Sequence, residues 1–143
     1  MKKILLIALF LTGLFVNAQE AEIKKAITTF FEGMHTRDTL KMQSAAVKEI
    51  VLQSINDKGS ASKLFTENPD EFYKSIAKIP TTMKIEERIL DYKIQIDGPM
   101  AHVWTPYEFY INGKFSHKGV NSFQLFNDNG TWKIVYIIDT RRK

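Results

Sequence analysis

Apolar residues recur at helical spacing in the first half of the chain and at strand spacing in the second. Residues 23–34 place apolar side chains three and four positions apart with Glu and Lys between them, which predicts an amphipathic helix. A shorter helix is predicted over residues 40–46. The β-branched segment 47–55 then predicts a strand.

A third helix is marked at both of its ends. Asn68 is a good N-cap residue, Pro69 suits a first helical turn, and Pro80 ends the pattern. From Met83 onward the apolar period is two, and Gly- and Asn-containing turns separate the segments. Four strands are predicted there, near residues 83–96, 100–111, 115–126 and 131–141. Helices followed by an antiparallel meander predict an α+β fold in which the sheet curls over the helices.

The start of the chain has the pattern of a cleavable signal peptide. Two lysines precede the apolar run 4–16, and a Val-Asn-Ala tripeptide ends at Ala18. The run is shorter than the roughly 20 apolar residues that span a bilayer. We therefore predict that residues 1–18 are removed and that residues 19–143 form one exported domain, periplasmic or secreted, which is not embedded in a membrane.

The charge and cysteine content of that domain limit the partners and the stabilising bonds that it can have. The 143-residue chain has 20 basic and 16 acidic side chains, and loss of Lys2 and Lys3 with the signal peptide lowers the formal charge from +4 to +2. This balance gives little electrostatic support to nucleic-acid binding. The chain has no cysteine, but 44% hydrophobic residues and ten Phe can form a core without disulfides.

The Asn112-Gly113 turn predicts which residues lie opposite one another in the sheet. A two-residue loop pairs Ile111 with Lys114 and, if the register continues unbroken, Glu108 with His117. We predict that this face is concave and lines a pocket. The candidate ligand-binding residues on it are Trp104, Glu108, Tyr110, His117, Asn121, Phe123, Tyr136 and Thr140.

The opposite face of the sheet is predicted to carry Asp139 and Arg141, as an exposed ion pair. A single β-bulge would reverse this assignment, because a shift of one residue exchanges the faces of a strand. The same outer face is predicted to form a homodimer through an apolar patch. That patch comprises Val103, Tyr107, Phe109, Val120, Val135 and Ile137.

The three histidines are too scattered to predict a metal site. His102 lies six residues before Glu108 on one strand, about 20 Å away, so it cannot share a site with His117. His35 stands at the end of the first predicted helix, where its charge would suit the helix C-terminus. We predict no metal and no cofactor.

The order of predicted elements resembles the nuclear transport factor 2-like superfamily. Segments 101–110, 117–123 and 130–141 are similar to a group of exported bacterial proteins in it, of the SnoaL-like or lumazine-binding type. The resemblance implies a cone-shaped α+β barrel whose helices pack on a curved antiparallel sheet around a cavity. Relatives use that cavity for isomerisation, cyclisation, dehydration, epoxide hydrolysis or binding alone, so the fold does not choose the function.

Three functions remain open at this stage. The first is non-catalytic binding of a small aromatic or terpenoid-like molecule in a partly apolar pocket. The second is a lyase or isomerase in which His117 is the general base and Glu108 orients it. The third is a dimerisation or interaction module. The sequence contains no self-sufficient catalytic motif, which favours the first.

Overall fold

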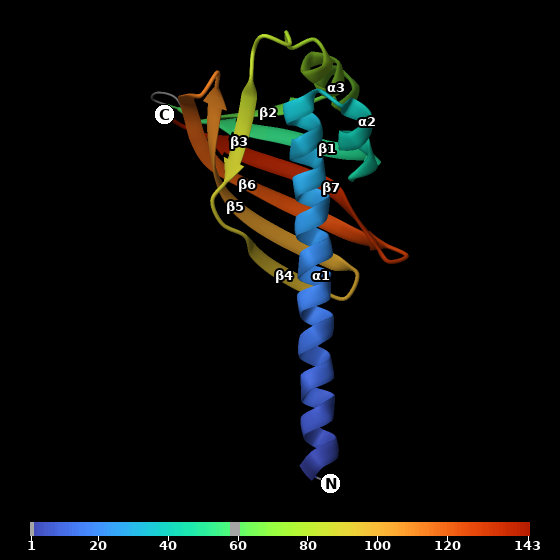
Figure 1. Cartoon of the computed structure of the whole chain (residues 1–143). Helices are drawn as coiled ribbons and strands as arrows, with labels where there is room; N and C mark the ends of the chain where they lie inside the picture. Colours follow the sequence, from blue (N-terminus) through green and yellow to red (C-terminus); the bar gives the residue numbers. More distant parts are fainter. Residues whose placement is uncertain (1, 58–60) are drawn as a thin grey trace.

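The computed structural model describes residues 2–57 and 61–143, which form three helices and seven strands (Figure 1). In chain order these are α1 (Lys2–Thr36), α2 (Thr39–Ser44), β1 (Ala46–Asn56), β2 (Lys63–Glu67), α3 (Pro69–Ala77), β3 (Ile85–Ile89), β4 (Lys93–Asp97), β5 (Met100–Ile111), β6 (Lys114–Asp128) and β7 (Thr131–Arg141). The predicted α+β order, with helices before the meander, is confirmed.

All seven strands form one curved sheet with the order β2-β1-β7-β6-β5-β3, and β4 pairs with the other half of β5. The pair β1–β7 is parallel, and the other pairs are antiparallel. Helix α1 crosses the concave face, with α2 and α3 at one end of the molecule (Figure 1). The edge strands β2 and β3 do not pair with each other, so the curved sheet is unclosed, and with the helices on its concave face it forms the cone-shaped α+β fold that we predicted.

Two strands depart from the sequence prediction. The expected strand over 83–96 is divided into β3 and β4, which pair with opposite halves of β5. The division lies opposite Pro106, which has no N–H for the ladder and accepts a single bond from the Leu90 N–H at 2.9 Å. Strand β2 was not predicted, because all five of its residues are exposed and give no alternation of apolar and polar positions.

Local capping explains where the shorter helices start. The Asp38 side chain accepts a hydrogen bond from the Lys41 N–H at 2.9 Å at the start of α2. Asn68 does the same for the Glu71 N–H at 3.1 Å at the start of α3, where Pro69 occupies the first turn as predicted.

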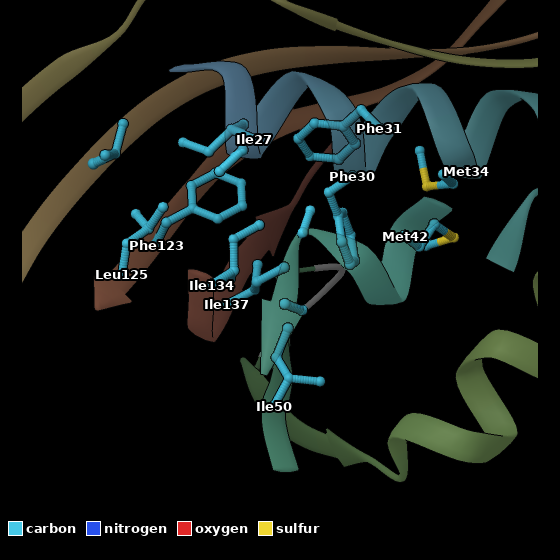
Figure 2. Close-up of a cluster of buried hydrophobic side chains, with 14 of the residues drawn as sticks. Ile27, Phe30, Phe31, Met34, Met42, Ile50, Phe123, Leu125, Ile134 and Ile137 are labelled. Carbon is cyan, nitrogen blue, oxygen red and sulfur yellow. The ribbon is translucent and has the colours of Figure 1, made fainter. Parts of the chain in front are cut away.

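The core lies between α1 and the concave face of the sheet. Figure 2 shows Ile27 and Phe31 of α1 directed toward side chains of the central strands, among them Phe123 and Ile134. The rings of Phe31 and Phe123 meet edge to face with their centroids 6.0 Å apart. Among the residues whose burial is described, the first core residue of α1 is Ile23. Of the helices described, none is long and apolar enough to cross a membrane.

Two one-residue β-bulges determine which side chains face the core. In β6 the register shifts at Ser116, so Tyr110 pairs with Phe115 but Phe109 pairs with His117. In β7 the register shifts at Val135, between the pairs Leu125–Ile134 and Gln124–Tyr136. Each bulge exchanges the two faces of one strand relative to its neighbour.

Candidate functional site

A cavity of about 370 Å³ lies between the helices and the concave face of the sheet. Its apolar wall is formed by α1, α3 and neighbouring strands. The helices contribute Phe30, Phe31 and Met34 of α1 and Phe72, Ile76 and Ile79 of α3. Its polar side comes from the sheet, mainly from Glu87, Tyr107, His117, Asn121, Asp139 and Arg141. Apolar walls with a few convergent polar groups are typical of small-molecule sites.

Glu87 of β3 is a carboxyl group of the cavity whose pKa is strongly raised. Its Oε1 accepts a hydrogen bond from the Asn121 side-chain amide at 2.7 Å. Burial raises the pKa of the Glu87 carboxyl to about 8, with a further rise from Asp139; the Asn121 hydrogen bond and the positive charge of Arg141 oppose the rise. At neutral pH Glu87 is therefore mostly protonated and can donate as well as accept a hydrogen bond.

The main chain at Glu87 is held by the first helix. Strand β3 is an edge strand, and the Glu87 N–H donates to His35 Nε2 of α1 at 2.8 Å. An acceptor at Nε2 requires a neutral imidazole, and burial lowers the pKa of His35 accordingly. His35 thus anchors an edge strand to α1, whereas the sequence suggested a contact with the helix C-terminus.

Asp139 of β7 is the centre of a second polar cluster. Its carboxylate accepts hydrogen bonds from the Ser54 hydroxyl, from the Tyr107 hydroxyl at 3.1 Å and from Arg141 Nε at 2.8 Å. The Tyr107 hydroxyl also lies 3.0 Å from the Thr140 carbonyl oxygen. Burial, followed by the charge of Asp139, raises the pKa of Tyr107, which stays protonated as a donor.

Gly119 leaves room for the Tyr107 side chain to reach this cluster. The two residues are directly opposite on β6 and β5. A Cβ at position 119 would lie 1.7 Å from the Thr140 carbonyl oxygen and 3.0 Å from Tyr107 Cε1. Only glycine permits such a close approach of neighbouring groups to the backbone.

Of the eight predicted ligand-binding residues, His117 and Asn121 line the cavity. The ring of His117 stacks on Phe109 with centroids 4.9 Å apart, and its edge contact with Tyr107 has a centroid distance of 5.9 Å. Phe123 faces inward but is fully buried in the core and is not part of the cavity wall.

The predicted pairing of Glu108 with His117 is wrong. The bulge at Ser116 pairs Glu108 with Lys118 and places it on the convex face, where it accepts a hydrogen bond from the Tyr110 hydroxyl at 2.7 Å. The same shift puts Trp104 on the convex face, with 43% of its surface exposed.

The bulge at Val135 reverses the predicted faces of the residues in the second half of β7. It turns Tyr136 and Thr140 away from the cavity and turns Asp139 and Arg141 into it. The reversal that a single bulge would cause was anticipated, but the sequence does not reveal where the bulge lies.

The apolar patch predicted for a homodimer is not formed as proposed. Val103 and Tyr107 are buried on the concave side, and Phe109 and Ile137 line the cavity. These four residues therefore cannot supply an outer interface.

The residues that sequence reasoning missed are Glu87, Tyr107, Asp139 and Arg141 as pocket groups. A signal for Glu87 existed, because it alternates with Ile85 and Ile89 and therefore shares their buried face. Within the described part of the chain, no group of three or more His, Asp or Glu side chains is placed to hold a metal ion.

Solved structures with the same fold come from several bacteria. A nuclear transport factor 2-like protein with a cystatin-like fold from Novosphingobium aromaticivorans superposes with a TM-score of 0.72 at 11% identity, over 92% of this chain and 87% of the other. A protein of the same family from Streptomyces avermitilis, described as a "putative dehydratase", gives a TM-score of 0.66 at 16% identity. The superposition covers 89% of this chain and 98% of the other.

A third similar structure is the β subunit of a "putative aromatic-ring-hydroxylating dioxygenase" from Novosphingobium aromaticivorans. Its TM-score is 0.71 at 11% identity, over 90% of this chain and 92% of that subunit. At these identities the similarities show the fold alone. No curated protein matches the chain significantly.

The family comparison covers most of the chain. The model of the family described as "Putative lumazine-binding" matches residues 18–137. The curved open sheet, the helices on its concave face and the solved structures agree with this match. The chain therefore belongs to the "Putative lumazine-binding" family and has the nuclear transport factor 2-like fold.

Proposed function

We propose that the protein is an exported, non-catalytic binding domain for a small, partly aromatic molecule. The observation that carries this proposal is the cavity between the helices and the sheet, whose helix side is mainly apolar and whose polar groups come mainly from the sheet. Its volume of about 370 Å³ lies within the range of small-molecule sites. Family membership supports ligand binding.

Blocking the cavity tests the binding function. Ser75 of α3 lines the cavity, and its replacement by phenylalanine places a ring where a ligand would lie. We expect wild-type protein to bind the neutral fluorescent probe N-phenyl-1-naphthylamine, and Ser75→Phe to weaken this binding at least ~10-fold because the apolar contacts are displaced. Fluorescence titration of protein purified after expression of the full chain measures both.

The matched control is Ala77→Phe, on the same helix but exposed and outside the cavity wall. Its affinity for the probe should equal that of the wild type. Equal affinity of Ser75→Phe, or no binding by the wild type, would contradict the proposed function. Native mass spectrometry of the same samples reports any ligand that copurifies.

Proton transfer is the second candidate function, and one observation favours it. Glu87 is a carboxyl group with a pKa of about 8 in an apolar cavity, which suits a general acid or base near neutral pH. The earlier candidate pair, His117 with Glu108, is divided between the two faces of the sheet. Conversion of a copurified compound by the wild type would favour this candidate over binding alone.

Export remains supported by the sequence pattern and by the position of the core. The core residues of α1 whose burial is described begin at Ile23, so removal of residues 1–18 leaves these residues in place. Figure 1 shows the N-terminal half of α1 extending beyond the sheet. We expect the periplasmic fraction of a Gram-negative expression host to contain a protein that begins at Gln19, measured by intact mass. Cytoplasmic protein with an intact N-terminus would contradict export.

A further inference from the structure

The charged groups of the cavity are unevenly balanced. Three acidic residues, Glu67, Glu87 and Asp139, line it together with one arginine, Arg141. The arginine is already paired with Asp139 through a bond of 2.8 Å. The ion pairs found among the described residues do not include Glu87. Among the described residues, Glu87 is therefore a cavity carboxyl group outside the ion pairs, with only the charge of Arg141, already bound to Asp139, acting on it.

Aromatic rings surround the same space. Phe30, Phe31 and Phe72 come from the helices, and Tyr107 and Phe109 come from β5. The faces of aromatic rings attract cations through their quadrupole, most strongly where water is excluded. A carboxyl group among aromatic rings thus combines the two kinds of group that favour a positively charged nitrogen.

An anionic ligand fits this cavity poorly. It would lie near Glu67 and Asp139, and the only arginine of the cavity wall is engaged by the Asp139 carboxylate. A neutral ligand would gain the apolar contacts and a hydrogen bond with the protonated Glu87 carboxyl, but it would not gain an ionic interaction with the Glu87 carboxylate. Because a partly desolvated charge is stabilised mainly by an opposite charge close to it, the choice between ligand classes depends on Glu87.

We infer that the ligand is a small organic cation, a protonated amine or nitrogen heterocycle, whose charged nitrogen donates to Glu87 while its apolar body lies among the aromatic rings. This inference rests on the proposed binding function and identifies the chemical class of the ligand. Asn121 holds the carboxyl in place through its 2.7 Å hydrogen bond.

Binding of a cation changes the protonation of its partner. The protein without ligand holds a proton on Glu87 at neutral pH, and a cation displaces that proton because it stabilises the carboxylate. Affinity therefore increases as the pH rises toward 8 and beyond, until the amine loses its own proton. The other titratable groups around Glu87 are His35 on α1, Glu67 on β2, Tyr92 before β4, Tyr107 on β5, His117 on β6, and Asp139 and Arg141 on β7. The Glu87→Gln variant separates the effect of Glu87 from theirs.

The experiment compares ligands that differ only in their polar group. The probes are a matched series of arylalkyl amines, alcohols and carboxylates, such as 4-phenylbutylamine, 4-phenylbutan-1-ol and 4-phenylbutyrate. Isothermal titration calorimetry on protein purified after expression of the full chain measures affinity at pH 6.5 and 8.5. We expect the amine to bind at least ~10-fold more tightly than the alcohol at pH 8.5. Its advantage should be smaller at pH 6.5.

The variants assign the effect to one residue. Glu87→Gln keeps an acceptor for Asn121. It should lower the affinity for the amine to the affinity for the alcohol, while the affinity for the alcohol stays unchanged. Glu86→Gln removes the neighbouring carboxylate of β3, which pairs with Arg88 and is not part of the cavity wall, and is the matched control, with the amine preference retained.

The outcomes separate this inference from the proposed function. Equal or tighter binding of the alcohol or the carboxylate would overturn the cation inference while upholding a binding cavity. An amine preference that persists in Glu87→Gln would overturn it as well. Absence of binding by the whole series, together with no binding of the fluorescent probe, would contradict the binding function itself.

Discussion

Gly119→Ala is expected to destabilise the domain by about 3 kcal/mol or more, since it introduces an atom where no space exists. The new Cβ would lie 1.7 Å from the carbonyl oxygen and 2.8 Å from the carbonyl carbon of Thr140. Both are backbone atoms of β7, so the clash cannot be relieved by a side-chain rotation. Relief requires β7 to move away from β6, which separates Tyr107 from Asp139. The free energy of unfolding in urea measures the effect.

Gly113→Ala is the matched control for that experiment. Gly113 lies in the turn before the same strand, and a Cβ there would meet no atom within 4 Å. Its φ of +74° still favours glycine, so a cost of about 1 kcal/mol is expected. Similar losses in the two variants would show that steric overlap at position 119 is not the dominant effect.

The stability of the domain should decrease as the pH rises from about 4.5 to about 8, because of Glu87. In this window the unfolded chain releases the Glu87 proton, whereas the folded protein retains it. Native protein thus binds more protons than unfolded protein, and a rise in pH favours unfolding. At about 1.4 kcal/mol per pKa unit the shift corresponds to at most about 5 kcal/mol. Contact with water in the cavity reduces this to ~2 kcal/mol.

Glu87→Gln removes the pH-dependent contribution of the Glu87 carboxyl to stability and keeps the size and shape of the side chain. The variant should resemble the wild type in stability at pH 4 and exceed it by ~2 kcal/mol at pH 8.5, where the wild type has a buried carboxylate. Urea unfolding of both proteins at the two pH values measures the difference. A difference that does not change with pH would show that Glu87 titrates normally in the folded protein.

The sequence was sufficient for the fold class and for most elements. The periodicity of residues 23–34 and the capping pattern at Asn68-Pro69 are local features that packing then reinforces, and both helices form. The turns at Asn112 and Asn129 also form as two-residue loops with positive φ. Strand β2 was missed because an exposed edge strand has no apolar alternation.

The candidate site could be predicted only in part, because two inserted residues determine which side chains face the cavity. Neither Ser116 nor Val135 differs in type from an ordinary strand residue, so the bulges leave no local signal. Their effect is large, since one inserted residue exchanges every side chain beyond it between the two faces. The side chains that face the cavity were predicted correctly for β6, which carries His117 and Asn121. They were predicted wrongly for β5 and for the second half of β7.

The parallel pairing of the first and last strands determines when the domain can fold. Strand β1 lies between β2 and β7, although about 75 residues separate the end of β1 from the start of β7 along the chain. During synthesis, the hairpin of β1 and β2 has no strand partner in the rest of the sheet until residues 131–141 have emerged, so the two parts of the sheet cannot be joined earlier. Contacts between such distant segments also slow folding.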